Sequence, residues 1–278
     1  MAPSLTGRRV LITGAARGIG AALAQRLHER GARVAIAGIE PELLEEVAAS
    51  CGGAPWHACD VTNRDEVEAA VAATVEDFGG LDVVVANAGV AAQLPLVGGN
   101  PEVMERTIAV NVMGVYNTLR AAGPHISHPG GYALPVASLA AALHLPMLGA
   151  YSASKAAVEA LGNTLRAELR GTGAKVGVAY FAELETDMTS RGFGTEAATK
   201  VAALKLTRVA PLKVGIDALE RGIARRSRRV VAPRWVGPLL RVRMMVQPVL
   251  DRGAQKGLRA ALETAREEDA PLTTPQPK

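Results

Sequence analysis

A tyrosine and a lysine four positions apart are the first side chains of this sequence whose types and spacing suggest catalysis. They are Tyr151 and Lys155, in the run Tyr-Ser-Ala-Ser-Lys. In a helix, a spacing of four places the phenol and the ammonium group on one face. A cation held beside a phenol lowers the tyrosine pKa from about 10, which makes the phenol a usable acid or base near neutral pH. Taken alone the pattern is weak, because Tyr-x-x-x-Lys occurs often by chance on amphipathic helices.

Three glycines near the start of the chain form a second candidate site. Gly14, Gly18 and Gly20 follow a short apolar run and lead into a helical pattern. Glycines permit a tight turn and a close approach of the backbone to a pyrophosphate, whose charge meets the free N–H groups at the positive end of the helix dipole. The alternative is a glycine-rich turn without a ligand. The position directly after the first predicted strand favours nucleotide binding.

The first two-thirds of the sequence predicts the scaffold that would position these residues. Apolar runs predict strands at 10–13, 33–37, 56–59, 83–86, 132–137 and 175–181, and Ala- and Leu-rich patterns predict helices at 18–30, 41–50, 64–77, 101–122 and 150–170. Strands that alternate with helices require crossover connections, so the sheet is expected to be parallel and covered on both faces. This is a single doubly wound α/β sheet. Ser138 then lies at its carboxyl edge, where ligands bind and where a hydroxyl can hydrogen-bond a substrate oxygen.

The regular alternation stops near residue 187. Residues 188–206 are polar and contain glycines, and their length suits a lid. A helix at 211–226 and a strand at 229–232 follow. We therefore expect a catalytic domain over 1–233, a basic amphipathic helical extension over 234–268 and an unstructured tail over 269–278.

Together these motifs resemble the classical short-chain dehydrogenase/reductase family, over about residues 5–233. The run from Thr13 to Gly20 fits that family's T-G-x-x-x-G-x-G motif, and Asn87-Ala88-Gly89 fits its N-A-G motif. The spacing Ser-x12-Tyr-x3-Lys is reproduced by Ser138, Tyr151 and Lys155. Segments such as 136–140 look like actinobacterial members. The resemblance implies a Rossmann fold and an NAD(P)-dependent oxidoreductase.

The resemblance also implies roles for individual residues. Tyr151 would exchange a proton with the substrate, and Lys155 would lower its pKa and hold the nicotinamide ribose. Ser138 would orient the substrate oxygen, and Asn111 would anchor a water that relays protons. The residues implied to bind the cofactor are Gly14, Ala16, Arg17, Gly18, Ile19, Gly20, Asp60, Val61, Asn87, Ala88, Gly89, Tyr151, Lys155, Leu184 and Thr186. No metal-ligand spacing is present.

Two departures from the family pattern affect the cofactor site. Phe181-Ala182 replaces the family's Pro-Gly beside the nicotinamide. Gly38 stands where NAD-preferring members carry an aspartate, and Arg17 could pair with a 2′-phosphate. Glu40 would restore a preference for NAD if its loop folds back. The resulting preference for NADP is slight.

The net positive charge of the chain comes from one segment. Residues 1–200 carry a net charge of −5 and residues 201–268 a net charge of +9, which with Asp269 and Lys278 gives the overall +4. In the extension, Trp235, Leu239, Val242 and Val246 can share one helical face. That face is expected to pack on its own domain or on a second subunit, with contact to an anionic membrane surface as the alternative. No nucleic-acid motif is present, so no nucleic-acid partner is expected.

The sequence leaves the substrate broadly defined. The stretch 140–150 is poor in polar residues, which predicts a small apolar alcohol or ketone as the substrate. A non-catalytic NAD(P)-binding sensor or scaffold of the same fold remains the alternative. The two cysteines and the lack of an apolar leader in the first ten residues predict a cytoplasmic protein. The family resemblance implies a homodimer or a homotetramer.

Overall fold

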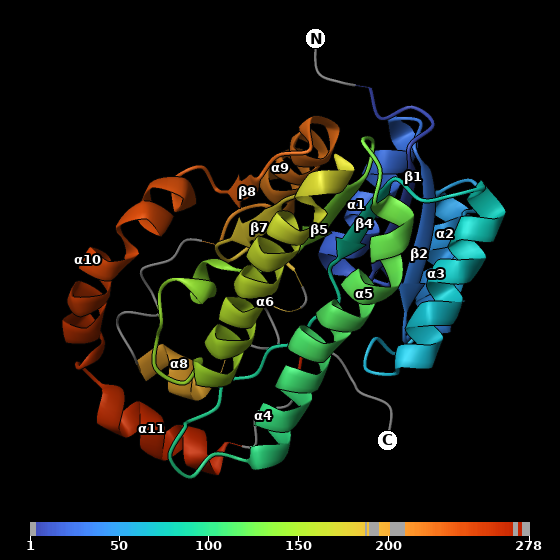
Figure 1. Ribbon diagram of the computed structural model, residues 1–278. Helices are drawn as coiled ribbons and strands as arrows, with labels where there is room; N and C mark the ends of the chain where they lie inside the picture. The colour runs from blue at the N-terminus through green and yellow to red at the C-terminus, as the bar shows by residue number, and fades with distance from the viewer. Residues whose placement is uncertain (1–3, 187, 189–194, 201–208, 269–271, 274–278) are drawn as a thin grey trace.

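A parallel sheet forms the centre of the molecule. The computed structural model describes residues 4–186, 188, 195–200, 209–268 and 272–273 of the chain. The strand order is β3-β2-β1-β4-β5-β6, and every pairing is parallel (Figure 1). The strands are β1 (Arg9–Thr13), β2 (Arg33–Gly38), β3 (Trp56–Ala58), β4 (Val83–Ala86), β5 (Tyr132–Pro135) and β6 (Lys175–Val176). The order reverses between β1 and β4, the place where doubly wound sheets bind ligands.

Helices cover both faces of this sheet, as the sequence predicts. One core is built by α1 (Gly18–Glu29), α2 (Pro41–Ser50) and α9 (Leu212–Arg225), which bury Leu23, Leu44 and Leu219 against the strands. The opposite core is built by α3 (Arg64–Phe78), α5 (Gly114–Ile126) and α6 (Gly149–Glu168), through residues such as Val67, Leu119 and Val158. The predicted doubly wound α/β fold is confirmed.

The single strand predicted over 175–181 is two strands. β6 pairs with β5, whereas β7 (Val178–Phe181) pairs with β8 (Arg229–Ala232). The change of partner falls at Gly177, where a Cβ atom would lie 2.2 Å from the Tyr132 hydroxyl and 2.3 Å from the Ser227 carbonyl oxygen. β7 still touches the end of β5 through a bridge between Val136 and Ala179, so Ser138 remains beside β7.

The single helix predicted over 101–122 is interrupted by a π-helical turn. α4 (Pro101–Ile108) leads into the π turn Ala109–Met113, and α5 follows. π turns inside helices are rare and are often found at functional sites. This one carries Asn111, a predicted catalytic residue, which is fully buried.

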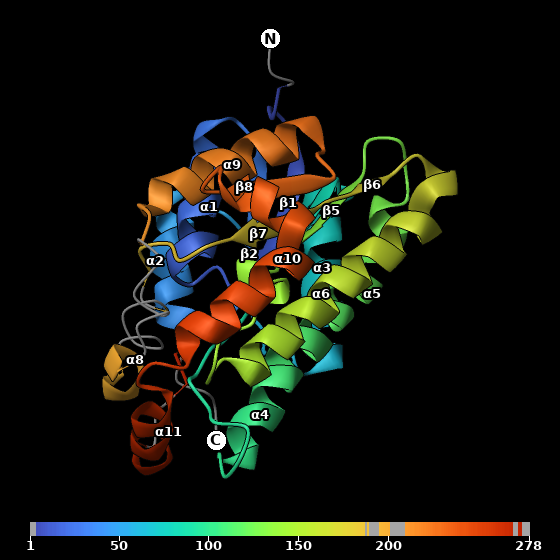
Figure 2. The same ribbon diagram turned by 90° about the vertical axis from the view of Figure 1, so that its left-hand side faces the viewer.

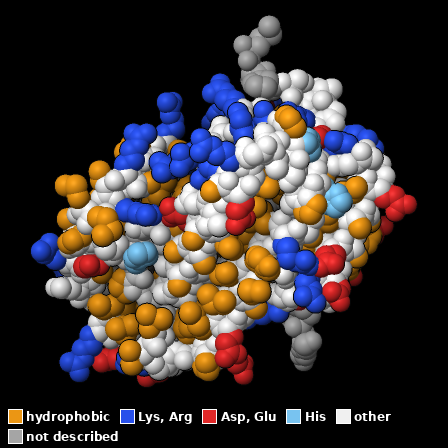
Figure 3. Space-filling model, in the orientation of Figure 1, with side chains coloured by type: hydrophobic (Ala, Val, Ile, Leu, Met, Phe, Trp, Pro, Cys, Tyr) orange, Lys and Arg blue, Asp and Glu red, His pale blue; other side chains and the backbone are white. Residues whose placement is uncertain are grey.

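The basic extension forms α10 (Val236–Ala254) and α11 (Leu258–Glu267), and α11 packs against α8 (Glu196–Lys200). Figure 2 shows α10 crossing the side of the molecule beside α6, and Figure 3 shows hydrophobic and basic side chains together on that side. Among the described helices, none combines the length and the apolar character needed to cross a bilayer. Most of the predicted lid at 188–206 lies outside the described residues.

An ion pair ties β1 to the start of β4 at the amino edge of the sheet. Asp82 Oδ2 accepts hydrogen bonds of 3.0 Å from both the backbone N–H and Nε of Arg9, and Oδ1 accepts one of 2.7 Å from Nη2. Burial raises the pKa of Asp82, but the hydrogen bonds from Arg9 outweigh that effect, so the pKa lies below its usual value.

The lowered pKa of Asp82 predicts a pH-dependent contribution to stability. A carboxyl whose pKa is lower in the folded state stabilises the fold above its unfolded pKa of about 3.9, and this stabilisation is lost as the pH falls through the folded value. We expect Asp82→Asn to reduce the free energy of unfolding by about 2 kcal/mol at pH 7. Urea unfolding from pH 7 to pH 3 should show this difference shrinking below about pH 4. Asp77→Asn, at an exposed aspartate, is the control; a pH-independent difference for Asp82→Asn would contradict the prediction.

Candidate active site

The glycine loop between β1 and α1 is shaped so that only glycine fits. Gly14 and Gly18 have φ angles of +64° and +57°. A Cβ atom on Gly14 would lie 2.5 Å from Ala88 Cα, and one on Gly20 would lie 2.3 Å from the Gly14 carbonyl oxygen. Both distances are too short for a side chain. The loop therefore presents bare backbone at the N-terminus of α1, which fits the pyrophosphate of a dinucleotide.

The end of β4 holds this loop in place. Asn87 Nδ2 donates hydrogen bonds of 3.0 Å to the carbonyl oxygens of Thr13 and Gly14, and the Asn87 backbone N–H donates to Thr13 Oγ1 at 3.2 Å. The N-A-G motif and the glycine motif thus form one hydrogen-bonded unit. Thr186 lies opposite the loop, where a Cβ atom on Gly18 would be 3.9 Å from its methyl carbon.

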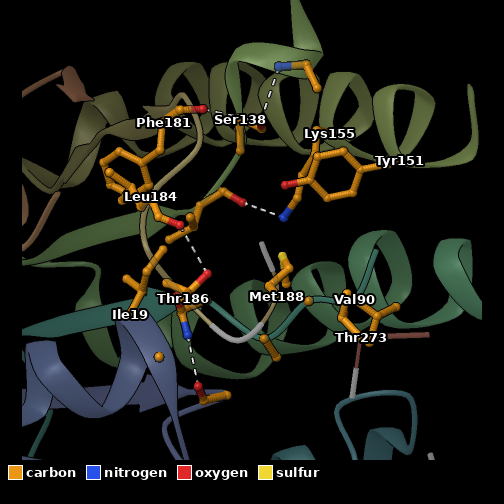
Figure 4. Close-up of a pocket in the computed structure, with 18 of the residues that line it drawn as sticks. Ile19, Val90, Ser138, Tyr151, Lys155, Phe181, Leu184, Thr186, Met188 and Thr273 are labelled. Atoms are coloured by element: carbon orange, nitrogen blue, oxygen red, sulfur yellow. Dashed lines mark hydrogen bonds between the residues drawn. The ribbon is translucent and has the colours of Figure 1, made fainter. Parts of the chain in front are cut away.

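Ser138, Tyr151 and Lys155 meet at the carboxyl edge of the sheet (Figure 4). Ser138 follows β5 and caps a short 3-10 helix, where its Oγ accepts a hydrogen bond from the Ala140 backbone N–H at 3.2 Å. Tyr151 and Lys155 lie on α6, are 8% and 3% exposed, and have the Lys155 Nζ 5.6 Å from the centre of the Tyr151 ring. Lys155 Nζ donates to the Val136 carbonyl oxygen at 3.0 Å.

Burial dominates the ionisation of this pair. It lowers the pKa of Lys155 to about 8. It also raises the pKa of Tyr151, and a hydrogen bond with Ser138 opposes that rise. The Tyr-x-x-x-Lys spacing predicts that Lys155 lowers the pKa of Tyr151. The structure has the opposite net direction, because desolvation of the phenolate outweighs the favourable interactions.

Asn111 lies behind the wall of the cavity. Its Oδ1 accepts a hydrogen bond of 2.8 Å from the Val90 backbone N–H, and its Nδ2 donates to the Val90 carbonyl oxygen and to Ser154 Oγ, both at 2.9 Å. Both amide hydrogens are therefore used within the protein. Asn111 fixes the segment that follows the N-A-G motif and joins it to α6. Ser154, three positions after Tyr151, is a partner that the sequence argument missed.

Two ion pairs shape the far end of the cavity. Asp60 Oδ1 accepts from the backbone and side chain of Thr62, and Arg106 Nη2 donates to Oδ2 at 3.0 Å. Burial raises the pKa of Asp60, but these contacts together lower it below its usual value. Arg17 pairs with Glu40 through two contacts, one of them Nε to Oε2 at 2.9 Å. The loop after β2 therefore does fold back, as the sequence argument required for a preference for NAD.

One cavity of about 420 Å³ joins nearly all of these residues. The predicted residues that line it are Gly14, Ala16, Arg17, Gly18, Ile19, Asp60, Val61, Asn87, Ala88, Gly89, Ser138, Tyr151, Lys155, Leu184 and Thr186. Gly20 and Asn111 do not line it and support its walls instead. Phe181 and Ala182, which replace the family's Pro-Gly, also line it. Among the described residues, no group of His, Cys, Asp and Glu side chains could hold a metal ion.

The other wall of the cavity comes from the C-terminal region. Trp235, Leu239 and Val246 line the cavity, so this predicted apolar face packs on its own domain. Val242 departs from it: the residue is 41% exposed and has non-helical φ and ψ angles of −109° and 16°. Thr273, in the segment predicted to be unstructured, also lines the cavity. No local pattern in the sequence indicates Thr273.

The fold and the site together define a dinucleotide-binding α/β protein with a Ser, Tyr and Lys set beside the nucleotide cradle. Residues 8–197 match the sequence profile of the short chain dehydrogenase family. Over 195 residues the chain is 35% identical to 2-(R)-hydroxypropyl-CoM dehydrogenase of Xanthobacter autotrophicus, covering 66% of this chain and 76% of that protein. It is 37% identical over 177 residues to D-threitol dehydrogenase of Mycolicibacterium smegmatis, covering 62% and 68% of the two chains.

Solved structures show the same fold. A short-chain type dehydrogenase/reductase from Mycobacterium marinum superposes with a TM-score of 0.74 at 27% identity, over 82% of this chain and 94% of that one. A short chain dehydrogenase from Burkholderia cenocepacia, solved in complex with NADP, has a TM-score of 0.76 at 24% identity, over 91% and 99%. The chain belongs to the short-chain dehydrogenase/reductase family, whose members are NAD(P)-dependent oxidoreductases.

Proposed function

We propose that this protein transfers a hydride between NAD(P) and an apolar secondary alcohol or ketone. The observation that supports this most directly is the continuity of the cavity. The cradle of bare glycine backbone and the Ser138, Tyr151 and Lys155 set open into the same space. A non-catalytic sensor would need the cradle but would have no use for a buried phenol and ammonium group at its other end.

The residues divide the work of the reaction. When bound, the nicotinamide supplies or accepts the hydride. Ser138 hydrogen-bonds the substrate oxygen, and Tyr151 donates a proton to that oxygen in reduction or accepts one in oxidation. Lys155 holds positive charge near the phenol and would hold the nicotinamide ribose. Asn111 keeps the Val90 backbone in place, and its role of anchoring a water that relays protons stays a prediction.

The substrate end of the cavity is apolar. Six leucines line it, namely Leu139, Leu143, Leu145, Leu148, Leu239 and Leu250. One of the relatives is named for D-threitol, a polyol. A polyol in this cavity would leave hydroxyl groups without hydrogen-bond partners, which costs about 1–3 kcal/mol for each buried group. We therefore assign a lipophilic substrate to this chain.

Three residues affect the choice between NAD and NADP, and they do not act in the same direction. Gly38 places no carboxylate at the end of β2, and Arg17 lies where a guanidinium can pair with a 2′-phosphate. These features support the slight preference for NADP. Glu40 opposes it, because its carboxylate occupies Arg17 and repels a phosphate.

The outer face of α10 supports contact with a membrane surface. Met244, Met245 and Val249 are 83%, 76% and 65% exposed. Arg241 and Arg252 are exposed at the two ends of this face, at helical spacing. An apolar band flanked by arginines is complementary to an anionic lipid surface. The inner face of the same helix lines the cavity, so a lipophilic substrate would reach the site from the lipid side.

The inner face is anchored to the catalytic domain. Arg243 Nη1 donates to Glu159 of α6 at 3.1 Å. The Gln247 amide exchanges two hydrogen bonds of 2.8 Å with the backbone of His144.

We also propose a homodimer or homotetramer, on the family resemblance, and a cytoplasmic location, which the buried free thiols Cys51 and Cys59 support.

The role of the phenol predicts the effect of its removal. Tyr151→Phe should lower kcat by about 10²- to 10⁴-fold, because the proton donor is lost, while the dissociation constants of NAD and NADP stay within twofold. Nicotinamide absorbance with a panel of lipophilic secondary alcohols measures turnover, and calorimetry measures binding. Tyr116→Phe, at an exposed tyrosine of α5, is the control. Cofactor binding by the wild type without any turnover would support the sensor instead.

The pairing of Glu40 with Arg17 predicts a shift in cofactor preference. Glu40→Gln should raise the ratio of kcat/KM for NADP to that for NAD by about tenfold, because the carboxylate that pairs with Arg17 and repels a phosphate is removed. Glu42→Gln, at an exposed glutamate two positions along, should leave the ratio unchanged. An unchanged ratio in Glu40→Gln would show that Glu40 does not face the 2′ position.

The exposed face of α10 predicts binding to anionic vesicles. The full-length protein should co-sediment with vesicles of phosphatidylcholine and phosphatidylserine, and less with phosphatidylcholine alone or at high salt. Replacing both Met244 and Met245 by Glu should abolish this binding, whereas Met113→Glu, on the π turn, should not. Absence of binding at any composition contradicts the proposal. Loss of a dimer in light scattering of the double variant would assign the face to a second copy.

A further inference from the structure

A short segment near the end of the chain reaches the wall of the active-site cavity. The Thr273 backbone N–H donates to the Ala91 carbonyl oxygen at 3.0 Å, and Thr273 Oγ1 accepts from the Ala91 backbone N–H at 3.0 Å. Thr273 is 2% exposed, and Leu272 beside it packs against the hydrophobic core. The two partners are 182 positions apart in the chain.

The place of this contact is close to the reacting groups. Ala91 comes two positions after the N-A-G motif and follows Val90, whose backbone Asn111 holds. Val90 and Thr273 both line the cavity. In Figure 4, Thr273 lies beside Val90, below Tyr151 and across the view from Ser138. Thr273 therefore borders space that a substrate at Tyr151 would enter.

The position of the Thr273 side chain is constrained in two ways. Its backbone N–H and its hydroxyl both bond to the same residue, so the hydroxyl cannot turn away without leaving a buried Ala91 N–H unpaired. A β-branched side chain also has few χ1 rotamers. A side chain that cannot change its rotamer excludes substrate groups that would overlap it, because protein interiors are close-packed.

We infer that Thr273 is a specificity-determining residue, which limits the size of the substrate group that lies beside Val90. The inference rests on the proposed function in that the substrate occupies this cavity. It adds a determinant from outside the region that matches the family profile, since that match ends at residue 197. Substrate range would then be set in part by a segment that lies 182 positions after Ala91 in the chain.

The experiment changes the volume at this position in both directions in the full-length protein. Thr273→Ala and Thr273→Leu are compared over a series of methyl ketones of increasing chain length and branching. Turnover is followed by nicotinamide absorbance, and binding to the cofactor-loaded enzyme by calorimetry. Thr273→Ala should raise kcat/KM for the bulkiest ketones at least fivefold relative to the smallest, and Thr273→Leu should lower that ratio by at least as much. Cofactor dissociation constants should stay within twofold.

Two further variants separate specificity from support of the fold. Thr273→Val keeps the volume of the side chain and removes the hydroxyl, so it should change kcat/KM for all ketones by a common factor. Thr172→Ala is the matched control, because Thr172 Oγ1 also accepts a backbone N–H, from Ala174 at 3.2 Å, and lies outside the cavity.

The outcomes distinguish this inference from the proposed function. Equal changes for all ketones in the Ala and Leu variants would overturn the inference and leave the proposed function intact. Ketones that bind to the wild type without turnover would overturn the proposed function, and the size dependence of binding would still decide the role of Thr273. A wild type that binds none of the ketones contradicts both.

Discussion

The buried ammonium group of Lys155 is the constraint on which the rest of the site depends. Removing a cation from water costs several kcal/mol, and the protein meets that cost with a carbonyl oxygen at the end of β5, that of Val136. The neighbourhood is fitted to it. A Cβ atom on Gly89 would lie 3.3 Å from Nζ and 3.2 Å from Asn111 Oδ1, so a side chain there would press on both groups. The same burial that brings Lys155 close to Tyr151 lowers its pKa to about 8.

The two halves of the cavity differ in how they are built. The cradle is made of backbone: a loop held by Asn87, at the N-terminus of α1, with no side chain between it and a ligand. The substrate half is made of side chains from α10, the loop after β5 and Thr273. A backbone cradle fits the part of the ligand that every member of such a family shares. Side chains of the terminal extension can vary without disturbing the cradle, because α10 packs against the hydrophobic core and pairs with Glu159 at the other half of the cavity.

The uneven distribution of charge along the sequence has a structural counterpart. The acidic residues 1–200 contain most of the catalytic domain. The basic segment 201–268 supplies Arg243, which pairs with Glu159 of that part, and exposed arginines on α10. Pairing also occurs in the opposite sense: Arg26 of α1, in the acidic part, is paired with Asp217 and Glu220 of α9, in the basic segment. The net charge of the chain therefore indicates less about a binding partner than the positions of the exposed basic side chains do.

The sequence by itself determined the sheet, the glycine cradle and the Ser, Tyr and Lys set, because these depend on local periodicity and on spacing within one helix or turn. Residues such as Tyr151 and Lys155 share a helical face wherever that helix lies. Only the tertiary structure decided the division of 175–181 at Gly177 and the π turn at Asn111, since both depend on contacts with distant strands and side chains. It also decided the direction of the Tyr151 pKa, which burial controls, and the arrival of Thr273 at Ala91. No local pattern can indicate a contact between segments 182 positions apart, because neither segment alone has the geometry that pairing creates.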